Sequence, residues 1–192
     1  MSTGHNKLII ITAPSGAGKT SITHFLLNKY PQLSFSISAA TRQPRGKEQD
    51  GVDYYFMSVD AFRKKIDENA FVEWEMVYDG KYYGTLKSEL ERIWLAGKIP
   101  MLDIDVKGAI HVQQQFANNC LSIFIEPPSV EELKRRLESR GTETPESIAT
   151  RVNKASYEIS FNHHFTKTIV NDNLAHACAE TEREIKAFLG WE

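Results

Sequence analysis

The 192-residue sequence has little of several features that would assign it to a specialised class of protein. No apolar run approaches the roughly 18 residues that a transmembrane helix needs. The formal net charge is only -2, which argues against a broad surface for nucleic acid or anionic membrane. There is no internal repeat and no low-complexity tract. We therefore expect one compact domain with small insertions that binds neither nucleic acid nor membrane.

Cysteine is also scarce, because Cys120 and Cys178 are the only two in the chain. Both stand among apolar residues and their spacing fits no metal site, so we expect reduced core residues. The first seven residues are polar and lack the apolar segment of a signal peptide. These observations predict a cytoplasmic protein with a short frayed tail at its N-terminus.

The strongest positive signal is a glycine-bearing loop that follows an apolar run and precedes a helical pattern. The loop consists of Ala13, Pro14, Ser15, Gly16, Ala17, Gly18, Lys19 and Thr20. Strand, loop and helix in this order predict a phosphate-binding loop, in which Gly16 and Gly18 let the backbone curl and aim its N–H groups inward. Lys19 can reach the β- and γ-phosphates of a nucleotide, and the Thr20 hydroxyl can bind Mg²⁺. The first position, usually glycine, is alanine, which fits with little strain if its φ is negative.

A second apolar run, over residues 99–105, ends in two aspartates. The alternation of a strand would place Asp103 and Asp105 on the same side. The run resembles a Walker B element, in which a carboxylate serves Mg²⁺ directly or through water. A strand that simply runs out into a polar loop is the alternative interpretation.

Positive charge gathers in a proline- and glycine-bearing loop over residues 40–47, which carries Arg42 and Arg45. Guanidinium forks match phosphate oxygens, so this loop can hold a second phosphate group. A solvated basic turn is the alternative, and composition alone would favour it.

A third basic cluster lies on a pair of helices that break at a Gly-Thr-Glu-Thr-Pro stretch. Ser129 opens the first helix as a capping box, and proline at position 145 suits the first turn of the second helix. The cluster includes Arg136, Arg140 and Arg151. The pattern indicates a mobile flap, with a solvated charged hairpin as the alternative.

The remaining pattern alternates strands and helices, apart from an aromatic-rich insertion of antiparallel strands over residues 38–96. Strands are predicted at 35–38, 53–57, 71–77 and 81–84, the last two joined by a hairpin turn. Thr85 is expected to cap the helix that follows. Glu73 is an acid inside an otherwise apolar strand, although alternation could simply turn it to solvent. The fold class is therefore α/β, a mostly parallel sheet with helices on both faces and ligands at the carboxyl ends of its strands.

Three separate basic elements around one phosphate loop indicate transfer of a phosphoryl group between two anions. Such a transfer requires both anions to be neutralised, aligned and shielded from water. It needs no serine, cysteine or histidine nucleophile, and the sequence shows no convincing triad.

On these motifs the sequence resembles the guanylate kinase family over nearly its whole length, from residue 8 to about residue 190. The matching stretches are residues 13–20, 38–45, 53–56, 71–74, 82–85, 102–105, 140–144 and 170–172. The resemblance implies a P-loop fold and an Mg²⁺-dependent reaction of purine nucleotide metabolism, in which ATP and GMP give ADP and GDP. We expect dGMP to be accepted as well as GMP, because the sequence shows no residue that would recognise the ribose hydroxyl groups.

The resemblance also implies a division of the chain into three parts. The ATP-binding core comprises residues 1–37, 97–134 and 156–192. A small GMP-binding insertion of mixed α/β structure covers residues 38–96, and a helical lid covers residues 135–155.

Carried over by motif, the site residues fall into groups. The GMP phosphate would be held by Ser38, Arg42, Arg45, Tyr54 and Tyr83. Guanine would be read by Glu73, Thr85 and Asp105, next to Gly84. The transferring phosphoryl group would meet Lys19, Arg42, Arg136, Arg140 and Arg151. The adenine of ATP would lie beside Asn171 and Asp172, and the metal would be held by Thr20 and Asp103.

The base-binding residues that the resemblance implies would favour guanine over adenine for a physical reason. Guanine presents an N1–H and an exocyclic amine, both donors that carboxylates and a hydroxyl can accept. Adenine presents an acceptor at N1 and would leave a buried carboxylate without a partner, which is costly.

Two alternatives belong to other functional classes. One is a different nucleoside monophosphate kinase, which Glu73 with Asp105 disfavours. The other is a non-catalytic interaction module, which typically loses the phosphate-loop residues that are present here and is attached to other domains. The oligomeric state stays open between monomer and homodimer.

Overall fold

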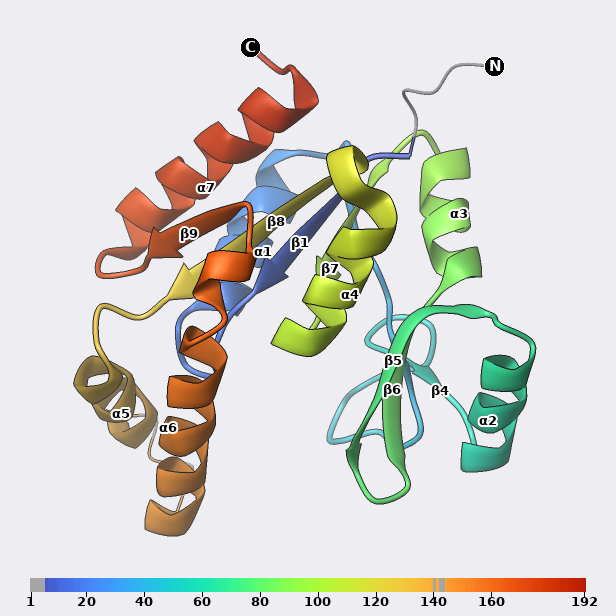
Figure 1. Ribbon diagram of the computed structural model, residues 1–192, viewed down its shortest axis with the longest axis horizontal. Helices are drawn as coiled ribbons and strands as arrows, with labels where there is room; N and C mark the ends of the chain where they lie inside the picture. Colours follow the sequence, from blue (N-terminus) through green and yellow to red (C-terminus); the bar gives the residue numbers. More distant parts are fainter. Residues whose placement is uncertain (1–5, 140, 142–143) are drawn as a thin grey trace.

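The computed structural model describes residues 6–139, 141 and 144–192 of the chain (Figure 1). Most of the expected N-terminal tail lies outside these residues. Within them, no helix has both the length and the apolar character that crossing a membrane requires. Both cysteines are free and buried, as the sequence predicts.

The core is a five-stranded sheet with the order β2-β7-β1-β8-β9, and all of its pairs are parallel. Its strands are β1 (Leu8–Thr12), β2 (Leu33–Phe35), β7 (Ile99–Asp103), β8 (Cys120–Glu126) and β9 (Lys167–Val170). β1 lies at the centre, so the loop that follows it emerges where neighbouring strands lead off in opposite directions. This is the position at which parallel α/β sheets bind ligands, and the predicted fold class is confirmed.

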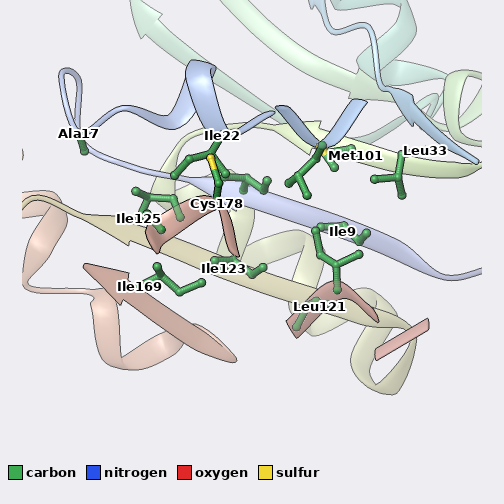
Figure 2. Packing of buried hydrophobic residues seen from close by; sticks show 14 residues of the cluster. Ile9, Ala17, Ile22, Leu33, Met101, Leu121, Ile123, Ile125, Ile169 and Cys178 are labelled. Carbon is green, nitrogen blue, oxygen red and sulfur yellow. The ribbon is translucent and has the colours of Figure 1, made fainter. Parts of the chain in front are cut away.

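Helices cover both faces of this sheet. They are α1 (Lys19–Lys29) and α7 (Leu174–Leu189) on one face, and α3 (Lys87–Leu95) and α4 (Val106–Phe116) on the other. The strands are therefore buried on both sides, which is why β1 reads as an unbroken apolar run. Ile9 and Ile11 point into the first cluster, shown in Figure 2, and Leu8 and Ile10 point into the second.

A smaller sheet with the order β4-β3-β6-β5 forms most of the insertion. Its strands are β3 (Ala39–Ala40), β4 (Tyr55–Phe56), β5 (Phe71–Tyr78) and β6 (Lys81–Leu86). Helix α2 (Val59–Asp67), capped by Ser58, packs on it through Phe62, whose ring stacks on Phe71 at 4.3 Å between centroids. The sheet is not wholly antiparallel as expected, because β3 and β4 pair in parallel.

Helices α5 (Val130–Ser139) and α6 (Pro145–Ile159) form the predicted hairpin. Their N-terminal N–H groups are capped by the side chains of Ser129 and Thr144. An apolar seam joins the two helices, made of Leu133, Leu137, Ile148 and Ala155. In Figure 1 this hairpin and the β5–β6 hairpin extend from the same side of the core. Two 3₁₀ turns, Ala117–Asn119 and Asn162–His164, complete the regular structure of the described residues.

The strand predicted over residues 35–38 is wrong in its position. β2 ends at Phe35, and the chain then crosses from the core sheet to the smaller sheet before β3 begins. The crossing is fixed by two bonds: the Ser36 N–H donates to the Met101 carbonyl, and the Ile37 N–H donates to the buried carboxylate of Glu89. The apolar–polar alternation over residues 35–38 therefore belongs to a connection between the two sheets and not to a single strand. Likewise, only Tyr55–Phe56 of the strand expected over residues 53–57 forms a ladder.

Two polar side chains have local roles that differ from the prediction. Thr85 does not cap α3, because its hydroxyl donates to Glu73 Oε1 at 2.6 Å inside the protein. Asp105 does not lie in a strand with Asp103, since β7 ends at Asp103 and Asp105 is the N-cap of α4. The Gly108 N–H donates to Asp105 Oδ1 at 2.8 Å.

Phe62→Ala should lower the free energy of unfolding by about 3–5 kcal/mol, since it removes a fully buried ring and leaves a cavity. Denaturant unfolding measures the loss, and hydrogen exchange should quicken first in the smaller sheet. Leu95→Ala, at a side chain that is 89% exposed, is the control and should change stability by less than about 0.5 kcal/mol. Equal losses in the two variants would contradict this role of Phe62.

Candidate active site

The loop over residues 13–20 has the backbone that the sequence predicts. Gly16 and Gly18 adopt φ values of 98° and 95°, which an L-residue rarely adopts. Ala13 has a negative φ, so alanine is accommodated there without strain. The N-terminus of α1 follows directly, and its unpaired N–H groups face the same space as the loop.

Asn171 fixes the phosphate loop through a hydrogen bond to its backbone. Its side chain is 4% exposed, and its Nδ2 donates to the Ala17 carbonyl at 2.7 Å. A Cβ on Gly18 would lie 2.2 Å from this nitrogen, so glycine is required there for space as well as for φ. The buried amide of Asn171 therefore positions the loop, while Asp172 is exposed at the surface beside it.

Lys19 pairs with Asp103 across the carboxyl ends of β1 and β7. The two side chains are partly buried, at 21% and 27% exposure. A lysine from the loop and an acid from the neighbouring strand thus meet where a phosphate and its metal would lie. Thr20 lines the same space and offers a hydroxyl oxygen.

The loop borders a cavity of about 430 Å³, which we call the loop cavity. Among its lining residues, Thr20 and Asp103 offer hard oxygen donors at the phosphate loop, the type that Mg²⁺ prefers together with phosphate oxygens and water. The described residues contain no group of three or more acidic, histidine or cysteine side chains placed to hold a metal by themselves. The donor set therefore fits a metal that arrives with a phosphate ligand.

Arg42 is held in a fixed orientation at the smaller sheet. Its guanidinium makes a bidentate pair with Glu48, at 2.6 and 2.8 Å, and its Nε donates to the Tyr83 hydroxyl at 3.1 Å. The guanidinium also lies 4.8 Å from the centre of the Tyr54 ring. The arginine lowers the pKa of Glu48 to about 2 and its own pKa is raised by the same pair. Arg42 therefore stays positively charged and lines the space beside the smaller sheet.

This second space, which we call the sheet cavity, has a volume of about 480 Å³. Its predicted residues are Ser38, Arg42, Arg45, Tyr54, Glu73, Tyr83, Gly84, Asp103, Asp105 and Arg151. The structure therefore brings the arginine loop, β5, β6 and the end of β7 around one space. Three arginines line it, Arg42 and Arg45 from the arginine loop and Arg151 from α6.

The two cavities share one wall. Five residues line both: Asp103, Ile104, Asp105, Arg151 and Lys154. Arg151 additionally donates to the Ser15 hydroxyl of the phosphate loop, so α6 contacts the loop directly. A group bound in one cavity can therefore meet a group bound in the other without crossing the protein.

Three acidic side chains that line one or the other cavity have perturbed pKa values. Burial raises the pKa of Glu73 to about 7, the nearby Asp105 charge adds to it, and the Thr85 hydroxyl bond opposes it. The pKa of Glu75 is also raised to about 7, because its carboxyl faces that of Asp105 and is partly buried. Burial likewise raises the pKa of Glu158. Clustered shifts of this kind are typical of functional sites.

Glycine at position 108 allows the acids to approach one another. A Cβ there would lie 2.8 Å from Glu73 Oε2 and 3.2 Å from Asp105 Oδ1. The first turn of α4 can therefore press against both carboxylates. Its free N–H end and dipole partly offset their charge.

Some predicted site residues lie away from the two cavities. Arg136 donates to Glu132 at 2.9 Å and to the Asn171 carbonyl at 3.0 Å. Ala17 and Thr85 are fully buried, and Thr85 reaches the sheet cavity only through Glu73. Arg140 lies outside the described residues, so its position stays a prediction.

The sequence analysis missed three lining residues: Glu75 of the sheet cavity, Glu158 of the loop cavity, and Lys154, which lines both. Their spacing carries the signal. Glu75 stands two residues after Glu73 on a strand, and Lys154 stands three residues after Arg151 on a helix, so each shares a face with a residue already identified.

Comparisons with known proteins agree with this geometry. The family model described as guanylate kinase matches residues 5–188. A guanylate kinase of Bacteroides fragilis is 48% identical over 188 residues, which cover 98% of this chain and 92% of that protein. One of Porphyromonas gingivalis is 48% identical over 184 residues, or 95% and 98% of the two chains.

A solved structure gives the same result at lower identity. The crystal structure of guanylate kinase from Anaplasma phagocytophilum aligns with a TM-score of 0.76 and 26% identity. The alignment covers 96% of this chain and 87% of that one.

Glu73→Gln should raise the free energy of unfolding at pH 8 by about 1–3 kcal/mol, because it removes a buried carboxylate whose pKa of about 7 exceeds its usual 4.5. A raised carboxyl pKa means that the folded protein loses stability as pH rises from about 4.5 to 7. The gain should therefore vanish near pH 4.5, while the glutamine can still accept the Thr85 bond. Denaturant unfolding at the two pH values measures it.

Glu48→Gln is the control, for which we expect a change in stability of the opposite sign at pH 8. The pKa of Glu48 is lowered, so its pairing stabilises the fold above its usual pKa and the variant should be less stable at pH 8. If Glu73→Gln loses stability equally at both pH values, burial does not govern this carboxyl.

Proposed function

The chain belongs to the guanylate kinase family, and on that premise we propose that it transfers the terminal phosphoryl group of ATP to GMP, giving ADP and GDP. The observation that carries the proposal is the wall shared by the loop cavity and the sheet cavity. Two nucleotides bound on either side of it would meet at their phosphate ends. Their bases would point in opposite directions, which end-to-end transfer requires.

We assign the loop cavity to ATP. Backbone N–H groups of residues 13–20 would cradle the phosphates, and Lys19 would exchange its pair with Asp103 for the β- and γ-phosphates. Asp172 would lie beside the adenine. Asn171 would act mainly by holding the loop, since its amide is already bonded to Ala17.

Mg²⁺ would be held by the Thr20 hydroxyl and by Asp103, directly or through water. When bound, it supplies positive charge between the phosphates of ATP. Opening of the Lys19–Asp103 pair would free the Asp103 carboxylate for the metal and the Lys19 ammonium for the phosphates.

The sheet cavity would bind GMP. Arg42, Arg45, Tyr54, Tyr83 and Ser38 would hold its phosphate as a cluster of cations and hydroxyl groups. Arg42 is fixed beforehand by Glu48, so little side-chain freedom is lost on binding. The same site would accept dGMP.

Guanine would be read by the carboxylates of Glu73 and Asp105. Both are held in place, Glu73 by the Thr85 hydroxyl and Asp105 by the Gly108 N–H. The N1–H and amine of guanine would give the buried Glu73 and the partly exposed Asp105 hydrogen bonds in place of those that water makes in the unfolded chain. Adenine, lacking the N1 donor, would leave the cost of burial uncompensated.

Chemistry in this site would consist of alignment and charge neutralisation. Lys19, Arg42 and Arg151 would surround the phosphoryl group, joined by Arg136 and Arg140 on closure of the α5–α6 hairpin. Both cysteines of the chain are buried away from the two cavities.

A coupled assay of ADP release with ATP, Mg²⁺ and one acceptor at a time tests the proposal. We expect turnover with GMP and dGMP, and turnover at least about 100-fold lower with AMP or UMP, because the wrong base leaves buried carboxylates unpaired. Turnover only with AMP would make the chain a different nucleoside monophosphate kinase. GMP binding without turnover would make it an interaction module.

Lys19→Ala is the control for a contaminating kinase in this assay. It should lower turnover by roughly 100- to 1000-fold, since it removes a fixed cation from the transferring group. Lys64→Ala, at an exposed surface lysine, should leave turnover unchanged.

A further inference from the structure

Lys154 has no role in the site as proposed, yet it occupies a position that few side chains share. It is one of five residues that line both the loop cavity and the sheet cavity, and with Arg151 it supplies the positive charge among them. The other charged members, Asp103 and Asp105, are acids. A cation on this wall therefore offsets the charge of these acids and attracts a phosphoryl group that moves from one cavity to the other.

The position follows from the geometry of α6. Arg151 and Lys154 are three residues apart on a helix that Thr144 caps, so they point from the same face. Arg151 is engaged with the phosphate loop through Ser15. Lys154 faces the region where the two cavities meet, one turn further toward the core.

The ammonium of Lys154 is loosely held. Its Nζ lies 3.6 Å from Glu158 Oε1, beyond hydrogen-bond length, and its side chain is 59% exposed. Its positive charge also acts on Glu75 from across the opening and opposes the rise in the pKa of both acids. Lys154 is therefore a weakly paired, exposed cation among several carboxylates.

We propose that Lys154 is a further catalytic residue, whose ammonium binds the phosphoryl group while it lies between the two nucleotides. The proposal rests on the proposed function. An oxygen of the GMP phosphate forms a bond to the terminal phosphorus of ATP as the bond from that phosphorus to the bridging oxygen breaks. The electron pair of the broken bond stays on ADP, and Lys154 keeps its proton throughout.

A purely structural interpretation would make Lys154 a surface partner of Glu158 four residues on. The chain offers a matched lysine for this comparison. Lys134 on α5 pairs with Glu138 at 3.9 Å with the same spacing, and its side chain is also 59% exposed. It lines neither the loop cavity nor the sheet cavity and lies in the groove between α5 and α6. Both lysines should stabilise their helices by similar small amounts, while only Lys154 should affect transfer.

The kinetic test compares Lys154→Gln, Lys154→Arg and Lys134→Gln with the unmodified chain, using ATP, Mg²⁺ and GMP. We expect Lys154→Gln to lower kcat by roughly 10- to 100-fold, less than loss of a buried, fully bonded donor would, because the side chain is exposed and only weakly paired. The KM for ATP should stay within about twofold, since the interaction is made only during transfer. Lys154→Arg should regain most of kcat, and Lys134→Gln should match the unmodified chain.

A binding test needs no turnover. An inhibitor in which adenosine and guanosine are joined through five phosphates spans both cavities, whereas ATP alone fills one. Calorimetry should show that Lys154→Gln weakens the bisubstrate inhibitor about tenfold and ATP less than twofold. Thermal unfolding should be the same for Lys154→Gln and Lys134→Gln.

The outcomes separate the two proposals. No GMP-dependent ADP release by the unmodified chain overturns the proposed function. An active unmodified chain with equal kcat in Lys154→Gln and Lys134→Gln overturns the role of Lys154. A higher KM with unchanged kcat also overturns it, because the lysine would then bind ground states only.

Discussion

Repulsion between two phosphate anions is the constraint on which this structure depends. Two unit charges 4 Å apart repel by about 4 kcal/mol at an effective dielectric constant of about 20, and both nucleotides carry several. The fold meets this constraint by placing cations on separate elements that face one wall: Lys19 after β1, Arg42 beside β3, and Arg151 and Lys154 on α6. Because these elements belong to a core sheet, a smaller sheet and a helical hairpin, no single element bears the whole repulsion among the cations.

Before a substrate arrives, Arg151 already bonds to Ser15, and four other cations of the site or its hairpin have acidic partners. Lys19 pairs with Asp103, Arg42 with Glu48, Arg136 with Glu132 and Lys154 with Glu158. Such pairs limit self-repulsion among the cations and hold the side chains near their working positions. Binding of a phosphate then exchanges one anion for another, which costs less than desolvating a free cation. Glu73 differs from these cations, because burial raises the pKa of its carboxyl to about 7 and its charge therefore destabilises the fold above that pH. In the proposed function, this is the cost of a carboxylate placed to select guanine.

Local patterns in the sequence predicted much of the fold. The apolar run before the phosphate loop, the glycines within it, the cap at Ser129 and the proline at the start of α6 each act over a few residues, and the structure confirms them. The errors came from residues whose roles depend on distant partners. The segment 35–38 crosses between two sheets, Thr85 bonds to Glu73 instead of capping a helix, and Asp105 caps α4. Lys154 and Glu75 share a face with Arg151 and Glu73, but the spacing alone does not show that this face lines a cavity, which depends on the packing of distant elements.

The central claim is that the phosphoryl group passes directly between nucleotides bound on either side of one wall. The most direct measurement is the stereochemistry at phosphorus, using ATP whose terminal phosphoryl group is chiral through oxygen isotopes and GMP as acceptor. A single in-line displacement inverts the configuration, and inversion is the result this account predicts. Retention would require two displacements through a phosphorylated side chain, and it would contradict the account.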